Sequence, residues 1–385
     1  MLDKALKGSR GYWTLIVFWL IVVITGVITY LFQLRDGLTL TGLSRDVPWG
    51  FYISQFTFLV GVAASAVMVV LPYYLHNYKA FGRMVVLGEF LAISAVAMCS
   101  LFIFVDMGQP MRVMNMILYP TLNSPMFWDF MVLMGYLFLN LVISWVTFGA
   151  ERKGLPPPKW IKPVIILSIP WAVSIHTITA FLYSGLEART FWMTAILAPR
   201  FLASAFASGP SLLIILALIL KKYTKFDPGK EAIQTLGKIV TYAMAINIFF
   251  VLVELFTGLY SDIPEHLHHF QYLFLGLHGK STLTPWIWTS QILAVGALFL
   301  LLFPKVRQRE GILAAICIGV IVAIWIEKGL GMVVTGFIPN PLEHITEYAP
   351  TLPEGLIALG VYGIGFLILT ILYKVAVSVR EEIEA

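Results

Sequence analysis

The sequence predicts an all-α polytopic membrane protein, and three observations support that class. The 385 residues are 59% hydrophobic and 12% charged, with a mean hydropathy of +0.86, whereas soluble domains carry about 25% charged residues. Apolar runs repeatedly reach the roughly 20 residues that a bilayer-spanning helix needs, without the alternation of a barrel strand. Lys and Arg are concentrated in alternate loops, a pattern that marks cytoplasmic loops.

We expect about ten transmembrane helices. In chain order they cover residues 12–34, 49–75, 83–105, 125–149, 162–183, 198–220, 238–260, 284–303, 311–336 and 354–376. The fourth opens with Ser124-Pro125-Met126-Phe127-Trp128 and the eighth with Thr284-Pro285-Trp286-Ile287-Trp288. Because an even number of spans separates these segments, they indicate a weak parallel repeat. Helices 2–5 (49–183) and 6–9 (198–336) would then form two four-helix bundles, flanked by helices 1 and 10, in one integral membrane domain covering 1–385.

The basic residues predict the orientation of the chain. Of the 26 Lys and Arg residues, 19 lie in the amino terminus, the even-numbered loops and the C-terminal tail, 6 lie in the odd-numbered loops and their rims, and Lys328 lies within a span. The excess marks the cytoplasmic side. Both termini are therefore expected in the cytoplasm, in a multi-pass protein of the cytoplasmic membrane. The net charge of +5 reflects this asymmetry and does not indicate nucleic-acid binding.

No soluble domain is expected, and the long loops at 106–124, 184–197, 261–283 and 337–353 are predicted to face outside. The two cysteines, Cys99 and Cys317, fall inside spans and form neither a zinc pattern nor a heme-attachment motif. The run Glu265-His266-Leu267-His268-His269 is expected to be a partner-docking loop, because it lacks the His pair and third ligand of a metal site. No metal site is predicted.

Ionisable residues within or at the rims of spans are the candidate functional groups. A charge at the centre of a bilayer costs roughly 2.5–3.5 kcal/mol or more, so each one suggests a site. Nearly all of them fall in the outer part of the membrane, and Glu89 alone lies toward the inner face. The set comprises Glu89, Asp106, Asp129, His176, Arg200, Glu254, Glu327 and Lys328.

Asp106 and His176 are the candidates for proton transfer. Asp106 closes the third helix, where a carboxylate opposes the helix dipole and so requires a partner or a function. The residue is either a functional group or half of a specific ion pair. His176 is the only histidine deep in a span, and imidazole titrates near neutral pH. It is either satisfied by a neighbouring helix or exchanges protons. A heme ligand is not expected, because bis-histidine ligation within the membrane needs a second deep histidine and the sequence has none.

The remaining charges suggest a proton path or buried ion pairs. Arg200 either extends to the membrane rim or pairs with an acid such as Asp106 or Asp129. The segment Glu327-Lys328-Gly329-Leu330-Gly331 is expected to interrupt the ninth helix. Glu327 and Lys328 point about 100° apart on a helix, so they require different partners, and a pair between Lys328 and Glu254 is one solution. Glu89 either begins a proton path or pairs with an inner basic residue such as Arg83.

Several segments together resemble the NrfD/PsrC family of quinone-interacting membrane subunits, over nearly the whole chain. The segments are Pro48-Trp49-Gly50-Phe51-Tyr52, the turn from Asp106 to Pro110 with Arg112, Asn123-Ser124-Pro125, His176-Thr177-Ile178-Thr179-Ala180, and Phe191 to Ala195 continuing into Pro199 to Ala205. The last stretch and the ten-span length are most similar to the DsrP-type subunits of the sulphite-linked DsrMKJOP complex.

The resemblance implies a subunit with no redox cofactor of its own that exchanges electrons between menaquinol or menaquinone and an extracytoplasmic iron–sulphur partner, in sulphur or sulphite metabolism. Iron–sulphur clusters and hemes would reside in partner subunits: a ferredoxin-like DsrO-type protein, a multiheme DsrJ-type cytochrome c, a heme b DsrM-type subunit and a DsrK-type subunit. The quinone pocket would lie near the outer face in helices 2–5, with Asp106 and His176 for proton transfer and with the quinone-binding residues Gln55, Tyr183, Arg112 and Asp129.

A secondary transporter or ion-translocating subunit is the alternative, because polar groups in glycine-interrupted helices also mark substrate paths. Transport would favour inverted repeats and a midplane site, whereas this chain shows a parallel repeat and an outer site.

Overall fold

The computed structural model describes residues 2–383 and is mainly helical, with one isolated antiparallel bridge between Leu277 and Lys280 among them. Within these residues, ten helical segments are long and apolar enough to cross a membrane. The predicted fold class, an all-α polytopic membrane protein, is therefore confirmed.

The spanning segments follow the predicted order. They are α2 (Arg10–Asp36), α3 and α4 (Phe51–Ala63 and Val67–Leu75) joined by the 3-10 turn η2 (Ala64–Ala66), α5 (Gly82–Asp106), α7 (Pro125–Arg152), α8 (Ile161–Ser184), α9 (Leu197–Tyr223), α10 (Lys230–Ser261), α12 (Thr284–Leu302), α14 (Glu310–Ile324) continued by η6 (Trp325–Gly331) and α15 (Met332–Thr335), and α16 (Leu352–Ile383).

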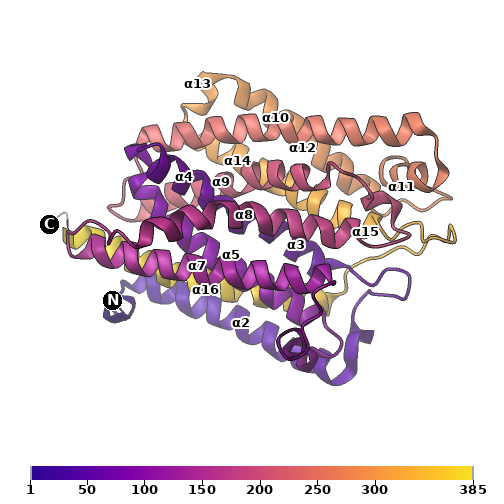
Figure 1. The fold of residues 1–385 in the computed structure, drawn as a ribbon, viewed down its shortest axis with the longest axis horizontal. Coiled ribbons are helices and arrows are strands. Elements are labelled where there is room, and N and C mark those ends of the chain that lie inside the picture. The colour runs from indigo at the N-terminus through magenta and orange to yellow at the C-terminus, as the bar shows by residue number, and fades with distance from the viewer. Residues whose placement is uncertain (1, 384–385) are drawn as a thin grey trace.

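The spans pack as two groups of four with two flanking helices (Figure 1). Helices α3, α5, α7 and α8 form the first group, and α9, α10, α12 and α14 form the second. The groups meet where α3 packs against α9 and η6. The long helices α2 and α16 pack against each other, and α16 also lies along α5. This packing agrees with the two bundles and the flanking helices that the sequence predicts.

Close approach of α2 and α16 depends on two glycines. Gly26 and Gly360 face each other, and an ideal Cβ on Gly360 would lie 2.6 Å from the Cα of Gly26. A real side chain does not fit at that distance, so the two backbones can touch only because both residues lack one. Small residues have this role at many helix contacts within membranes.

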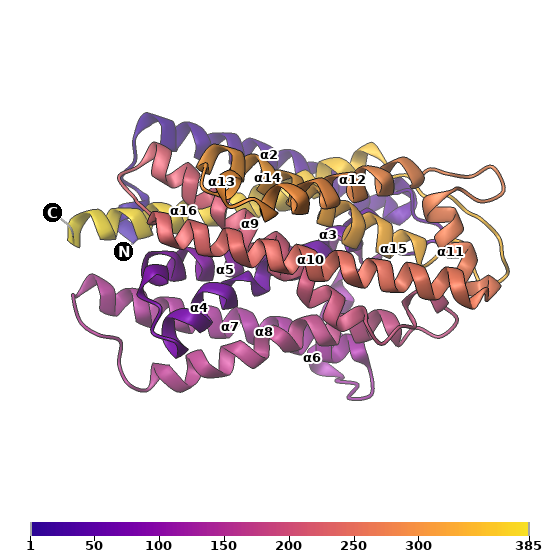
Figure 2. The same ribbon diagram turned by 90° about the horizontal axis from the view of Figure 1, so that it is seen from above.

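Both chain ends lie at one end of the helix bundle, and the longest connections lie at the other (Figures 1 and 2). An even number of spans requires this geometry. The end that carries the long connections is called the outer end below, following the predicted orientation. That it faces outside the cell stays a prediction.

The outer connections contain short helices. They are η1 (Gly37–Leu40), η4 (Pro110–Met114), α6 (Asn115–Leu118), η5 (Thr190–Trp192) and α11 (Pro264–Phe274). The expectation that His266 to His269 lie in a loop is therefore wrong. Pro264 in the first turn followed by Glu265 is a favourable helix start, a signal that was present in the sequence. At the inner end are α1 (Leu2–Ala5), η3 (Lys79–Phe81) and α13 (Pro304–Arg307).

Candidate functional site

Asp106 is the last residue of α5, and one of its carboxylate oxygens, Oδ1, is buried without a hydrogen-bond partner. Neither Arg112 nor Arg200 forms an ion pair with it among the described residues. Arg112 lies exposed in η4, so the structure does not bring this predicted quinone-binding residue to the carboxylate. The unfavourable position of Asp106 is therefore not explained by a basic partner within the described chain.

Gln33, which sequence reasoning did not single out, and Tyr52, from one of the family-like segments, hold the end of α5 in place. The carbonyl of Val105 accepts a hydrogen bond from Gln33 Nε2 at 2.7 Å, and Gln33 Oε1 accepts one from the Tyr52 hydroxyl at 2.7 Å. Gln33 comes from α2 and Tyr52 from α3, so three helices converge beside Asp106. Gln33 is a polar residue in an otherwise apolar first span, which is the signal that could have identified it.

A second buried carboxylate, Glu354 of α16, lies close enough to Asp106 for an electrostatic interaction. Its oxygens accept hydrogen bonds from the Tyr348 hydroxyl at 2.6 Å and from the backbone N–H groups of Gly42 and Thr351 at 2.8 Å each. An acid in the first turn of a helix is ordinary capping chemistry, so the sequence did not set Glu354 apart. Unlike Asp106, it has hydrogen bonds to both carboxylate oxygens.

The interior of the first bundle contains three predicted site residues on facing helices. Tyr183 of α8 shares a short hydrogen bond with Thr57 of α3, and Asp129 of α7 accepts one from Thr179 at 2.6 Å. His176 lies two turns before Tyr183 on α8, is 0% exposed, and has no hydrogen-bond partner at either ring nitrogen. The bundle interior thus holds a carboxylate, an imidazole and a phenol.

Gln55 faces away from that interior. Residues 55 and 57 are about 200° apart on a helix, so Gln55 and Thr57 lie on opposite faces of α3. Gln55 Oε1 accepts hydrogen bonds from Trp325 Nε1 and the Tyr362 hydroxyl, each at 2.7 Å, while its Nε2 is buried without a partner. The structure therefore places Gln55 against η6 and α16, outside the ring of α3, α5, α7 and α8.

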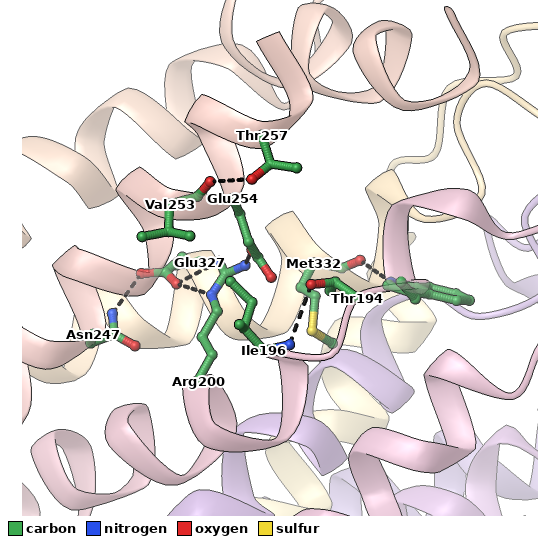
Figure 3. Close-up of polar contacts among 10 residues, drawn as sticks. Thr194, Ile196, Arg200, Asn247, Val253, Glu254, Thr257, Glu327 and Met332 are labelled. Carbon is green, nitrogen blue, oxygen red and sulfur yellow. Dashed lines mark hydrogen bonds and ion pairs between the residues drawn. The ribbon is translucent and has the colours of Figure 1, made fainter. Parts of the chain in front are cut away.

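A buried ion-pair cluster lies in the second bundle (Figure 3). Arg200 of α9 pairs with Glu254 of α10 and with Glu327 of η6, the latter at 2.8 Å, and Asn247 Nδ2 donates to Glu327 at 3.1 Å. The expected partners of Arg200, Asp106 and Asp129, are wrong. Arg200 lies in the first turn of α9, which faces α10 and η6, so the two glutamates there are within its reach.

Lys328 does not join this cluster, so the expected pair with Glu254 is also wrong. Its Nζ lies 4.4 Å from the centre of the Phe201 ring and donates a 3.4 Å hydrogen bond to the Phe201 carbonyl. The adjacent residues Glu327 and Lys328 do have different partners, as their helical offset predicts. The expected helix interruption is a π-helix, η6, where an ideal Cβ on Gly329 would lie 3.1 Å from the Ser54 carbonyl oxygen.

Glu89 and the outer histidines make local contacts. Glu89 is buried toward the inner end of α5, where its Oε2 accepts a 3.1 Å hydrogen bond from Ser144 and its Oε1 is unpaired. His268 contacts Glu343 at 2.7 Å, and His269 Nδ1 lies within 2.9 Å of two backbone carbonyl oxygens, those of Thr335 and Ile338. Among residues 2–383, no three His, Cys, Asp or Glu side chains gather as metal ligands would.

These features define a class of protein: a helical membrane protein with buried, unpaired proton-accepting groups near its outer end. The chain matches the family described as "Polysulphide reductase, NrfD" over residues 39–338. It therefore belongs to the NrfD family, as its motifs predict.

Three curated relatives extend the comparison. The chain is 26% identical to a putative membrane subunit of the dimethyl sulfoxide reductase of Halobacterium salinarum, over 94% of this chain and 90% of the relative. It is 24% identical to a subunit of the selenate reductase of Mesobacillus selenatarsenatis, over 94% and 93%. It is 25% identical to the integral membrane subunit of the Hdr-like menaquinol oxidoreductase of Archaeoglobus fulgidus, over 71% and 67%. All three relatives are subunits of oxidoreductases.

Proposed function

We propose that this chain is the quinone-reactive membrane subunit of an electron-transfer complex, and that Asp106 exchanges protons with menaquinol or menaquinone at the outer end of the first bundle. The observation that carries the proposal is the buried Oδ1 of Asp106, which lacks any partner in the described chain. A buried polar atom without a partner costs free energy. A ligand hydroxyl at this position would satisfy it.

The chemistry of quinol oxidation matches the groups available. Oxidation of one quinol releases two electrons and two protons, and removal of a proton from a ring hydroxyl requires a base. Asp106 supplies a carboxylate for this step. Tyr52 and Gln33 position the helix end that carries it. Asp129, His176 and Tyr183 supply further proton-exchanging or hydrogen-bonding groups within the same bundle.

We propose that electrons pass to another subunit, because the two cysteines, Cys99 of α5 and Cys317 of α14, are too few to hold an iron–sulphur cluster. We propose an iron–sulphur partner that docks on the outer end, with the hemes of the complex in other subunits. The outer connections that contain α11 and η5 would supply the docking surface. The relatives' names mention dimethyl sulfoxide, selenate and menaquinol, and the expected link to sulphite metabolism through a DsrP-type complex stays a prediction.

The Asp106→Asn variant tests this proposal, because it keeps the size of the side chain and removes its basicity. Loss of a general base typically slows a reaction by about 10²–10⁴-fold. The intact complex should assemble, retain its iron–sulphur spectra and lose quinol-dependent reduction of those clusters to that extent. The matched control is Asp36→Asn, at the outer end of α2, where the Asp36 carboxylate pairs with its neighbour Arg35. Wild-type turnover by Asp106→Asn would refute the assignment, and failure of the subunit to accumulate would make Asp106 a structural residue.

A further inference from the structure

A second feature of the structure lies on the other face of α3. An almost wholly apolar cavity of about 190 Å³ lies between α3, α5, α9, α14 and α16. Apolar side chains from all five helices line it, including Phe58, Leu59, Met98, Leu212, Ile321 and Leu369. Protein interiors contain few voids larger than a water molecule, so a cavity of this size has room for part of an apolar ligand.

A buried amide, that of Gln55, adjoins the cavity. Trp325 and Tyr362 line it, and both donate their only polar hydrogen to Gln55 Oε1. These two bonds fix the amide of Gln55 and leave its Nε2 as a buried donor without an acceptor. Gln55 is 1% exposed, so the missing acceptor is not bulk water. A carbonyl oxygen of a bound molecule would complete this amide.

The lining also restricts the charge of the occupant. No Lys, Arg, Asp or Glu is among the lining residues, and the Ser94 hydroxyl already donates to the Phe90 carbonyl at 3.0 Å. A phosphate or free carboxylate would meet no cation there, and its desolvation would be very costly. The occupant that fits has a neutral, carbonyl-bearing head and a long apolar chain, which is the chemistry of an isoprenoid quinone.

The packing of the helices around the cavity leaves it an exit to the lipid. Helix α16 packs mainly against α2 and α5, whereas α14 packs mainly against α9 and α12. The lining residues on the α14 and α16 sides, Ile321, Trp325, Tyr362 and Phe366, are partly exposed. An apolar chain can therefore pass between these helices into the bilayer without crossing a polar surface.

We propose that this cavity binds the isoprenoid tail of the quinone, and that Gln55 Nε2 donates a hydrogen bond to a ring carbonyl. Tyr52, Gln55 and Leu59 follow one another along one face of α3, at helical spacings of three and four residues. The stripe runs from the hydrogen-bonded end of α5, beside Asp106, into the cavity. The quinone thus enters between α14 and α16 with its ring toward the outer end. The inference rests on the proposed quinone function and assigns the tail to the space between the two bundles.

The test compares two ligands that share a ring and differ in the tail. The full chain in phosphatidylcholine nanodiscs is titrated with menaquinone-4 and with tail-less 2,3-dimethyl-1,4-naphthoquinone. Leu369→Phe, at a position 4% exposed in the cavity wall, should weaken binding of menaquinone-4 about tenfold, because displacing about two methylene groups costs roughly that factor. The tail-less ligand should bind as before. Gln55→Met should weaken binding of both ligands.

The matched control is Leu359→Phe, the same change on the same helix at a position 57% exposed to the lipid, and neither affinity should change. Equal effects of Leu369→Phe on the two ligands, or none on either, would overturn the tail assignment while leaving the quinone function intact. If wild-type protein binds neither ligand, the proposed function itself fails.

A measurement on the wild-type chain tests the proposal without any variant that could misfold. Menaquinone with a photoreactive diazirine at the end of its tail should label peptides from α3, α14 or α16 that line the cavity. Labelling confined to α2 or to the interior faces of α7 and α8 would refute the proposal. Native mass spectra that retain a phospholipid, which excess menaquinone-4 does not displace, would identify an acyl chain as the occupant and refute it as well.

Discussion

At the scale of single residues, the sequence located the charged groups but not their partners. Arg200, Glu254 and Glu327 are distant in sequence, yet the fold joins them in one cluster. The expected partners of Arg200 were acids at a similar depth, Asp106 and Asp129. Depth along a helix follows from the 1.5 Å rise, whereas the direction of a side chain around the axis depends on which neighbour the helix packs against. That information is tertiary, so the partners could not be derived.

The same limitation applies to Gln55. The family resemblance implied a polar residue on the second span, and Gln55 was the candidate. Whether it faces Tyr183 or Tyr362 depends on the rotation of α3 between the two bundles. Gln33 and Glu354 show the converse case, because neither was singled out from the sequence and their contacts form only where α2, α3, α5 and α16 meet.

Because His269 is buried, we expect the stability of the outer connection that contains α11 to depend on pH. Burial lowers the pKa of His269 to about 4, although hydrogen bonding with the Ile338 and Thr335 carbonyls and the charge of Glu343 raise it. An exposed histidine has a pKa of about 6.5. Between these values the unfolded segment binds a proton that the folded one does not. The folded outer connection therefore has its full stability above pH 6.5, where His269 is neutral in both states. That stability falls as the pH drops toward 4, by at most about 1.4 kcal/mol per pH unit.

Hydrogen exchange of the α11 amides, corrected for intrinsic rates, should accordingly rise between pH 7 and pH 5. In His269→Gln, which keeps an N–H donor but does not titrate, protection of α11 should be weaker overall and independent of pH. An equal pH response in both proteins would assign it to another group, with His266 and Glu343 as the nearest candidates.

At the scale of elements, the sequence was a reliable guide to properties that depend only on the local segment, such as whether it forms a helix. Each of the ten predicted spans is a helical segment, because length and hydropathy decide that property. The repeated helix openings also have a shared geometry: Trp128 Nε1 donates to the Leu122 carbonyl at 2.8 Å, and Trp288 Nε1 donates to the Phe274 carbonyl at 2.9 Å. The Ser124 side chain, at the start of α7, makes no capping hydrogen bond.

The helix interruption at Glu327 to Gly331 was expected from its charges and glycines, but its π-helical form was not. A π-helix adds one residue to a turn and is common at functional sites. Here Trp192 Nε1 bonds to the Met332 carbonyl at 2.9 Å, just beyond η6. The contact comes from η5, in a connection whose conformation the sequence did not reveal.

The contact between α2 and α16 predicts a position-specific effect of glycine substitution. Gly360→Val should force the helices apart at Gly26 and destabilise the protein by about 1–3 kcal/mol, the usual cost of overpacking. Gly296→Val on α12 is the control, because nothing lies within 4 Å of an added Cβ there. Thermal melting in detergent should show a lower Tm for the first variant only. A melting temperature equal to that of the control would mean that the two helices do not pack in this register.

At the scale of the whole molecule, composition and pattern predicted the fold class, the number of spans and the placement of both termini at one end. They did not predict how the two bundles meet. That interface brings α3 against α9 and η6 and creates the cavity beside Gln55. Apolar side chains on a lipid-facing surface and on a bundle interface look alike in sequence, so the distinction needs the three-dimensional packing.

The orientation of the molecule in the membrane is the last prediction, and it follows from the 19 of 26 Lys and Arg residues that lie in the even-numbered loops and the termini. Such an excess marks the cytoplasmic side, so the opposite end, with α11 and the exposed tip at His278, should face outside. His278→Cys should react with a membrane-impermeant maleimide in intact spheroplasts. Lys305→Cys, exposed at the other end, should react only after permeabilisation. The natural cysteines Cys99 and Cys317 are both buried, so the background is low. The reverse pattern would place the Asp106 end in the cytoplasm and would require the electron-accepting partner to dock there.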